Sequence, residues 1–324
     1  MLAEARHLTR ACIHLDRLDH NLRLLQELAG ERPLWPAIKA NAYGHGLEII
    51  ARELVMLGCD TLCVAHVTEA VELVEAGIPA RLLLLSATLP EHSEAIVRHR
   101  CEPVVCDLRM LEALGRTAAR LAMPVAVHLA VDTGRGRIGL QPSQVSAFLA
   151  RCRDFASVQV RGLMSHFPCA DMADKTLSNS QIHSFNGVID AARTYAVGAC
   201  HMANSAAIFD LPNAYYDAVR PGISIYGLRP SWEIGNPLVE ELKPVLEWKT
   251  RVSFLKEVPA GTGLSYGHAW HAPTPALTSE KLERPLRPGD LPAALGIVAS
   301  IRLARALGYL RGLCASLGRG PEEV

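Results

Sequence analysis

The sequence predicts an α/β protein, a closed (β/α)8 barrel of the TIM type followed by a partial β domain. Eight short apolar segments alternate with helical segments between Leu34 and Arg220. Near-continuous apolar strands separated by helices are typical of a parallel sheet that is covered on both faces. Eight such units in about 190 residues fit a closed barrel better than an open sheet. The alternation ends near residue 228, where longer strand-like segments begin.

Each predicted barrel strand is a short, mainly apolar run. The eight runs lie at 34–38, 61–65, 81–86, 103–106, 125–131, 158–165, 201–204 and 218–220. The predicted helices lie at 16–28, 47–57, 68–76, 91–100, 107–121, 143–153 and 174–196. Asp16 and Asp107 are expected to cap the helices that they begin, because a short carboxylate accepts a backbone N–H at a helix start.

Two breaks in the pattern divide the chain. The pairs Arg229-Pro230 and Asn236-Pro237 predict a linker, and strand-like sequence follows from residue 242 to 258. After about residue 275 the chain is rich in proline and arginine and loses strand alternation. We therefore expect a strand in residues 1–15 that joins the C-terminal domain, a barrel at 16–228, a partial β domain at 229–275 and an atypical tail at 276–324.

Composition excludes several classes of protein. The formal net charge of the 324-residue chain is +0, which gives no electrostatic footprint for nucleic acid. No apolar run is long enough to span a membrane, and residues 1–6 lack the apolar core of a signal peptide. The nine cysteines are scattered without a CxxC pair, so neither a disulfide framework nor a metal site is expected. Composition thus predicts a cytoplasmic protein with reduced thiols.

The chemical pattern begins with the stretch AIKANAYGHG at residues 37–46. It places Lys39 at the end of a buried strand, just before a glycine-bounded turn. Desolvation at such a position lowers the pKa of the amine and makes it a nucleophile, as in lysines that form Schiff bases. The alternative is an ordinary surface lysine at a strand end.

Polar residues also end other strands, and the chemistry of such barrels lies at the C-terminal ends of the strands. The residues expected to join Lys39 at that end are Asp132, His166, Asn204 and Arg220. Arg137, in the glycine-rich loop 131–139, either binds a phenolate or carboxylate or is simply solvated. His166 either packs beside a cofactor ring or is a structural histidine. Ser205 either N-caps a helix or binds an anion with the backbone N–H groups beside it.

The loops after strands seven and eight are the usual phosphate site of these barrels. Gly222 and Ile223 are therefore expected to offer their amides to a phosphate, with Arg220 deeper, near a cofactor ring. Tyr266 lies in a predicted hairpin turn, where a tyrosine is normally a packing or surface residue. It becomes a useful base only if its surroundings lower its pKa from about 10.

Taken together and in this order, the motifs resemble those of bacterial alanine racemases from about Ala11 to Ala272. The string AIKANAYGHG is similar to the pyridoxal-phosphate lysine motif of that family. The resemblance implies a (β/α)8 barrel with a C-terminal β domain, pyridoxal 5'-phosphate as the cofactor and a head-to-tail homodimer. It also implies interconversion of L-alanine and D-alanine, which supplies D-alanine for cell-wall peptidoglycan.

The resemblance also assigns roles to residues. Lys39 would form the Schiff base with the cofactor and act as the base on the D-enantiomer. Tyr266 would be the base on the L-enantiomer, reaching the site of the partner subunit. Arg137 would meet the cofactor phenolate and the substrate. The other cofactor contacts would be the phosphate-binding Tyr43, Ser205, Gly222 and Ile223, the nearby Asn204, Arg220 at the pyridine nitrogen, and His166 behind Arg220. Because guanidinium keeps its proton, Arg220 would leave the pyridine nitrogen largely unprotonated. That weakens the cofactor ring as an electron sink and favours simple proton exchange.

Three features depart from the family pattern. Ala130 stands where many members have a carbamylated lysine that orients the arginine, so Arg137 needs another partner, such as a chloride or a water. Arg135 stands where methionine is usual. The later C-terminal motifs of the family are absent, which suggests a reading frame disrupted near residues 275–285 and a truncated racemase of impaired activity. A broad-specificity amino-acid racemase and a non-catalytic barrel that binds the cofactor stay open as alternatives.

Overall fold

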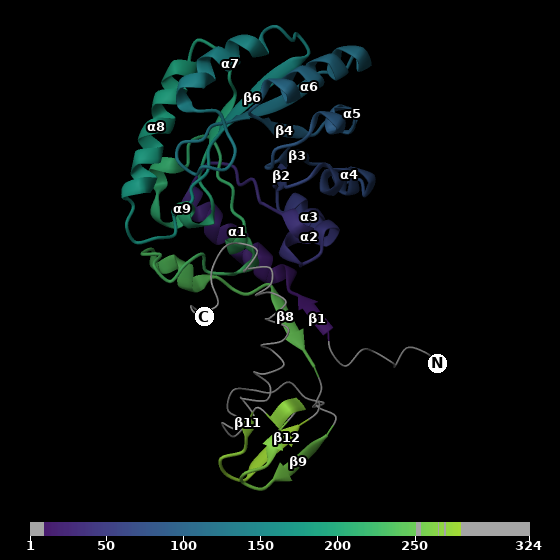
Figure 1. Cartoon of the computed structure of the whole chain (residues 1–324), viewed down its shortest axis with the longest axis vertical. Helices are drawn as coiled ribbons and strands as arrows, with labels where there is room; N and C mark the ends of the chain where they lie inside the picture. Colours follow the sequence, from purple (N-terminus) through teal and green to yellow (C-terminus); the bar gives the residue numbers. More distant parts are fainter. Residues whose placement is uncertain (1–9, 251–253, 265, 269, 280–324) are drawn as a thin grey trace. The chain divides into compact units, whose positions relative to one another are not determined.

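The computed structural model describes residues 10–250, 254–264, 266–268 and 270–279 (Figure 1). The chain divides into two compact units. The larger unit runs from Ile13 to Leu246, and the smaller one is formed by the chain on either side of it. Each unit is described by itself below.

The larger unit is built on a curved parallel sheet with the strand order β2-β3-β4-β5-β6-β7. The strands are β2 (Thr61–Val64), β3 (Arg81–Leu84), β4 (Glu102–Val105), β5 (Val125–Ala130), β6 (Val158–Met164) and β7 (Ala199–His201). Each strand pairs in parallel with the next one along the chain, as right-handed β-α-β connections require.

Two further segments close this sheet into a barrel. Leu34 bridges Val219, Ala37 bridges Cys63, and His201 bridges Ala218, all in parallel. Residues 34–38 and 218–220 are thus the first and eighth strands, and the closed eight-stranded barrel expected from the sequence is confirmed. Both segments form isolated bridges rather than ladders. Pro36 and Pro221 explain this, since proline has no N–H to donate to a neighbouring strand.

Helices cover the outside of the sheet, as Figure 1 shows for α4 to α8. The helices are α1 (Leu15–Ala29), α3 (Leu47–Met56), α4 (Val67–Glu75), α5 (Ser93–Arg98), α6 (Leu108–Leu121), α7 (Val145–Cys152), α8 (Thr176–Ala192) and α9 (Ser205–Asp210). The single turn α2 (Lys39–Tyr43) belongs to the site described below. The 3-10 turns are η1 (Pro90–His92), η2 (Pro142–Gln144), η3 (Pro212–Ala214), η4 (Ile223–Tyr226), η5 (Pro237–Glu241) and η6 (Tyr266–His268).

The two capping predictions had different outcomes. Asp107 is the N-cap of α6, and its Oδ1 accepts the Met110 N–H at 3.0 Å, as predicted. The prediction for Asp16 was wrong, because α1 begins at Leu15 after His14. Asp16 instead lies in the first turn, where its negative charge still faces the positive end of the helix dipole.

The barrel unit has two apolar layers. The larger layer lies between the strands and the outer helices and includes Leu18, Ile50, Leu114 and Phe185. The second fills the inside of the barrel, and its buried members are Trp35, Ala37, Cys63, Leu83, Val104, Ala130, Met164 and Ala218. The barrel is therefore a packed core rather than a pore, which leaves its rim as the place for chemistry.

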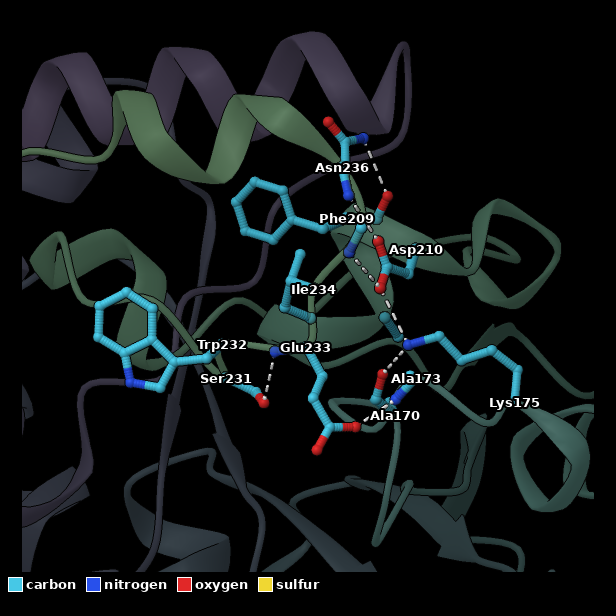
Figure 2. Close-up of polar contacts among 12 residues, drawn as sticks. Ala170, Ala173, Lys175, Phe209, Asp210, Ser231, Trp232, Glu233, Ile234 and Asn236 are labelled. Carbon is cyan, nitrogen blue, oxygen red and sulfur yellow. Dashed lines mark hydrogen bonds and ion pairs between the residues drawn. The ribbon is translucent and has the colours of Figure 1, made fainter. Parts of the chain in front are cut away.

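The segment expected to be a linker packs on the barrel unit instead (Figure 2). Asp210, which ends α9, accepts the backbone N–H groups of Gly235 and Asn236 at 3.2 and 3.1 Å, and it pairs with Lys175 at 2.9 Å. Ile234 is 5% exposed. Backbone hydrogen bonds and an apolar anchor thus hold a stretch that proline pairs alone suggested would be free.

Among the described residues in and beside the smaller unit, the short strands form three pairs. In the first pair, β1 (Arg10–Ile13) lies beside β8 (Leu246–Lys249). The other two pairs are antiparallel, β9 (Leu255–Val258) with β12 (Ala276–Ser279) and β10 (Gly263–Leu264) with β11 (Trp270–His271). Strand β12 extends the β region four residues beyond the predicted end at 275. The rest of the predicted tail, 280–324, lies outside the described residues.

Candidate active site at the C-terminal rim of the barrel

Lys39 begins a turn of left-handed helix at the end of the first barrel strand. Ala40, Asn41, Ala42 and Tyr43 all have φ of 53–54°. Residues with a Cβ avoid this region at a cost of about 1–2 kcal/mol each, so four in a row form a strained segment. The sequence predicted a glycine-bounded turn here but not its handedness.

Side chains from neighbouring elements hold this turn in place. Glu69 of α4 accepts the Ala40 N–H at 2.6 Å, directly after Lys39. Its other oxygen accepts the Ala65 N–H at 2.8 Å, at the end of β2. Asn41 Oδ1 accepts the Leu47 N–H at 2.7 Å and so joins the turn to α3. Sequence reasoning missed Glu69. Its place at the third position of a helix, where capping boxes put a glutamate, was the available signal.

The environment of Lys39 favours the neutral amine. Burial lowers the pKa of Lys39, and the charges of Arg137 and Arg135 lower it further, while Glu69 acts in the opposite direction. A larger fraction of the amine is therefore unprotonated at neutral pH, which is the form that attacks a carbonyl carbon. This is the electrostatic setting that the sequence predicted for a Schiff-base lysine.

The glycine-rich loop after β5 is organised by Asp132. One of its carboxylate oxygens accepts the N–H groups of Gly134 and Arg135 at 3.0 and 2.8 Å, and the other accepts that of Gly136 at 3.0 Å. Arg135 Nη1 donates to the Phe167 carbonyl at 3.1 Å. Arg137 is exposed at the end of this loop. Asp132 therefore shapes the loop that carries both arginines.

A cradle of polar groups joins the ends of strands seven and eight. Ser205 Oγ accepts the N–H of Gly222 at 2.8 Å and that of Ser224 at 3.3 Å. Because the oxygen accepts both, its own proton is available for a further acceptor. Of the two alternatives for Ser205, the structure excludes the N-cap. Asn204 caps α9, accepting the Ala207 N–H at 3.1 Å.

Tyr43 reaches from the left-handed turn to this cradle. A Cβ added at Gly222 would lie 2.8 Å from the Tyr43 hydroxyl, so the absence of a side chain there lets the phenol approach the backbone. The Tyr43 ring packs on Tyr226, with ring centroids 5.0 Å apart. Burial raises the pKa of Tyr43 to about 12, which keeps its hydroxyl a proton donor at neutral pH. Ile223 follows as the first residue of η4.

Arg220 lies deeper than the cradle and is 3% exposed. Its Nη2 donates to the carbonyls of Ser165 and Met202 at 2.7 and 3.3 Å and lies 3.4 Å from His166 Nδ1. Burial lowers the pKa of Arg220 to about 10, which still leaves the guanidinium charged at neutral pH. Burial and the charge of Arg220 also keep His166 neutral, by lowering its pKa well below the ordinary value.

The structure thus brings most of the candidate residues to one end of the barrel. Tyr43, Ser205 and Gly222 are in mutual reach, and Arg220 contacts His166. Tyr266 begins η6 in the smaller unit. The methyl group of Ala130 packs inside the barrel, so no charged group at that position orients Arg137. Among the described residues, no cluster of three potential metal ligands exists and no helix is long and apolar enough to cross a membrane.

Comparisons with known proteins agree with this arrangement. The family model "Alanine racemase, N-terminal domain" matches residues 13–230. An alanine racemase of Halothermothrix orenii is 39% identical over 262 residues, which cover 80% of this chain and 69% of that protein.

Two solved structures have the same fold. An alanine racemase of Clostridium difficile superposes with a TM-score of 0.80 at 29% identity, over 85% of this chain and 73% of that one. The enzyme from a Streptomyces lavendulae that produces D-cycloserine gives a TM-score of 0.79 at 32% identity, over the same shares. The chain therefore belongs to the alanine racemase family.

Proposed function

We infer that this protein is an alanine racemase that uses pyridoxal 5'-phosphate to interconvert L-alanine and D-alanine. The observation that carries the inference is the placement of Lys39. Its amine has a lowered pKa and lies at the rim of a barrel whose other strand ends offer an anion cradle and a buried arginine. Family membership supports the same reaction and the same cofactor.

The residues present fit that cofactor. Its phosphate needs hydrogen-bond donors, which the hydroxyls of Ser205 and Tyr43 supply beside a glycine with no Cβ. The N–H of Gly222 is already donated to Ser205, so we assign the phosphate mainly to the two hydroxyls and to the Ile223 amide. Its aldehyde needs a neutral amine, which Lys39 offers. Its ring nitrogen needs a donor that does not release its proton, which Arg220 offers.

When bound, the cofactor draws electrons from the α-carbon of an attached amino acid and so acidifies the Cα–H bond. Racemisation then needs two bases on opposite faces of that carbon. We assign one face to the Lys39 amine and the other to the Tyr266 hydroxyl of a partner subunit in a homodimer. Each group takes a proton in one direction of the reaction and returns one in the other. Arg137 binds the cofactor phenolate and the substrate carboxylate, and His166 lies behind Arg220.

We propose that the protein acts in the cytoplasm and supplies D-alanine for cell-wall peptidoglycan. Alanine fits as the substrate because the relatives with which this chain aligns are named for it. The resemblance of the motifs to broad-specificity racemases makes other small amino acids the second candidate, to be tested alongside.

The first experiment tests cofactor binding at Lys39. Purified protein is mixed with pyridoxal phosphate, reduced with borohydride and digested, and the modified lysine is located by mass spectrometry. We expect modification of Lys39 and none in Lys39→Ala, while Lys243→Ala, a change at an exposed lysine, is modified like the unaltered protein. An unmodified Lys39 would remove the basis of the proposal.

The second experiment tests turnover. L-alanine is incubated with the protein in D2O, and exchange at Cα and formation of D-alanine are followed by NMR and by an oxidase specific for D-amino acids. Exchange with racemisation supports the racemase, and a panel of other amino acids measures its breadth. Cofactor binding without exchange would instead favour the non-catalytic barrel.

A further inference from the structure

A continuous chain of hydrogen bonds runs from Arg220 through the inside of the barrel. Arg220 Nη1 contacts His201 Nδ1, and His201 Nε2 lies 2.8 Å from His128 Nδ1. His128 Nε2 in turn lies 3.0 Å from Glu102 Oε2. None of the four residues is more than 5% exposed. We call these four residues, Arg220, His201, His128 and Glu102, the inner relay.

The relay spans the barrel from one end of the strands to the other. Arg220 and His201 lie at the C-terminal ends of strand eight and β7. His128 lies within β5, and Glu102 is the first residue of β4. The relay therefore connects the rim that carries the site with the opposite end of the barrel.

The chemistry of its two ends fixes the direction of every hydrogen bond. Arginine has no acceptor, so the Nδ1 of His201 must be bare and its Nε2 must carry a proton. That proton makes the Nδ1 of His128 an acceptor, so the Nε2 of His128 is protonated. It donates to Glu102, and an ionised carboxylate can only accept. Both imidazoles are thus neutral and share one tautomer.

The far end of the relay is held as a carboxylate. Arg81 donates from Nε and Nη2 to the two oxygens of Glu102, each at 2.9 Å, and Arg161 lies 3.6 Å away. Burial acts to raise the pKa of Glu102, but the hydrogen bonds from His128 and Arg81 outweigh it and bring the pKa to about 2. Glu102 is therefore a permanent acceptor at neutral pH.

The backbone makes room for the relay. A Cβ added at Gly162 would lie 2.5 Å from His128 Nδ1 and 2.4 Å from the Ala199 carbonyl. The register of β5 against β6 also shifts between Val127 and His128. The indole of Trp35 packs edge-on against both imidazoles, with centroids 4.9 Å from His201 and 6.0 Å from His128. The backbone and the Trp35 indole are thus arranged to accommodate the two imidazoles.

We propose that His201, His128 and Glu102 are positioning residues that hold the Arg220 guanidinium in one plane and one protonation state toward the cofactor ring. The proposal rests on the proposed function. With Nη1 donated to His201 and Nη2 to the carbonyls of Ser165 and Met202, the guanidinium cannot rotate without losing hydrogen bonds. Transfer of a proton from Arg220 to His201 would create a buried imidazolium, and burial lowers the pKa of His201 well below its ordinary value, so the proton stays on the guanidinium.

The first test reads the two tautomers directly. The full chain is labelled with 15N-histidine, and its ring nitrogens are observed by NMR with and without pyridoxal phosphate between about pH 5 and about pH 8. The charged groups that surround the two imidazoles are Glu102, Arg81, Arg161 and Arg220. We expect two histidines with protonated Nε2 and bare Nδ1 that do not titrate, assigned by their loss in His128→Gln and His201→Gln. A protonated Nδ1 at either position, or titration in this range, would overturn the relay.

The second test cuts the relay beside Arg220. His201→Leu removes the acceptor, whereas His201→Gln retains an amide that can accept from Arg220 and donate to His128. We expect about ten-fold weaker binding of pyridoxal phosphate and loss of its visible circular dichroism in His201→Leu, with both largely restored in His201→Gln. Circular dichroism reports the orientation of the bound ring, which a change in stability alone would leave intact.

Thr117→Val is the matched control, because it breaks the buried 3.0 Å hydrogen bond between Thr117 and Ser93 on α6 and α5. It should reduce stability without changing cofactor affinity or dichroism. Unchanged affinity and dichroism in His201→Leu would refute the proposal, and if that variant does not fold, the NMR test of the unaltered protein decides. Failure of the unaltered protein to bind any pyridoxal phosphate would refute the proposed function. The histidine tautomers, observed without the cofactor, test the hydrogen bonds of the relay separately.

Discussion

Glu69 and Ala40 are joined by a 2.6 Å hydrogen bond from the backbone N–H that directly follows Lys39 to a carboxylate on α4. The same carboxylate accepts the Ala65 N–H at the end of β2. One side chain therefore ties the first two strand ends together at the position of the proposed cofactor lysine. It also places a negative charge near an amine whose other charged neighbours, Arg135 and Arg137, are positive.

Replacing Glu69 should disturb the backbone turn at Lys39 without changing Lys39 itself. In Glu69→Gln an amide NH2 replaces one carboxylate oxygen and faces a backbone donor. At least one of the three hydrogen bonds that Glu69 accepts from backbone N–H groups is therefore lost, and the strained turn loses support. We expect about ten-fold weaker binding of pyridoxal phosphate, measured by absorbance titration. Glu72→Gln, an exposed change on the same helix, is the control and should bind normally. Equal affinity in the two variants would contradict a role for Glu69.

Gly222 should tolerate alanine only when the Tyr43 hydroxyl is removed. The added Cβ would lie 2.8 Å from that oxygen, so Gly222→Ala must displace the phenol from the cradle. We expect Gly222→Ala to weaken cofactor binding more in the unaltered background than in Tyr43→Phe. A double-mutant cycle measures this coupling as a departure from additivity, which contacting residues show at about 0.5–3 kcal/mol. Additive effects would mean that the two groups do not meet.

The ionisation of Glu102 should make the free energy of unfolding depend on pH in the acid range. Its pKa is about 2 in the folded protein, against about 4.3 for an unperturbed glutamate. Between these values the unfolded chain binds more protons than the folded one. The contribution of Glu102, about 3 kcal/mol, is thus complete above the unfolded pKa and is lost as the pH falls toward 2.

Urea unfolding at about pH 5 and about pH 3 measures this loss. The free energy of unfolding should fall more steeply with acid in the unaltered protein than in Glu102→Gln, which has no proton to gain. Parallel decreases in the two proteins would show that other carboxylates dominate the acid response.

Asp210 should anchor residues 231–236 to the barrel unit (Figure 2). Its side chain is 10% exposed and pairs with Lys175, which also donates to the Ala170 carbonyl at 2.8 Å. Asp210→Asn leaves a largely buried ammonium without its charge partner, and we expect a loss of about 3 kcal/mol in unfolding free energy. Proteolysis within 231–236 should also become faster. Asp190→Asn, at an exposed pair with Arg193, is the control and should change stability by less than about 1 kcal/mol.

Much of the barrel could be predicted because its signals are local. Apolar runs between helical segments located the six strands of the sheet, and Asp107 marked the start of α6. The left-handed turn after Lys39 could not be predicted, because in the sequence Ala-Asn-Ala-Tyr only asparagine adopts positive φ readily, and then as a single residue. Surrounding contacts from Glu69 and Asn41 impose it.

The sequence indicated those candidate site residues that stand in motifs at strand ends. It did not indicate the buried polar residues behind them. Lys39, Ser205 and Arg220 stand at strand ends, which is where a barrel exposes function. Glu102 begins β4, one residue before the predicted strand 103–106, and His128 lies within the predicted strand 125–131; no sequence motif singled out either residue. A charged residue beginning such a strand was the available signal, but its partners come from β3, β5 and β6 and only the folded barrel brings them together.

The bridge between Leu34 and Val219 closes the barrel by joining segments from opposite ends of its sequence. Lys39 stands on one side of that closure, and Gly222 on the other. A nascent chain that has emerged only as far as α8 carries the lysine but has neither half of the cradle beside it. Cofactor capture must therefore wait until translation has passed strand eight, and a ribosome stalled earlier would hold a chain that cannot be loaded.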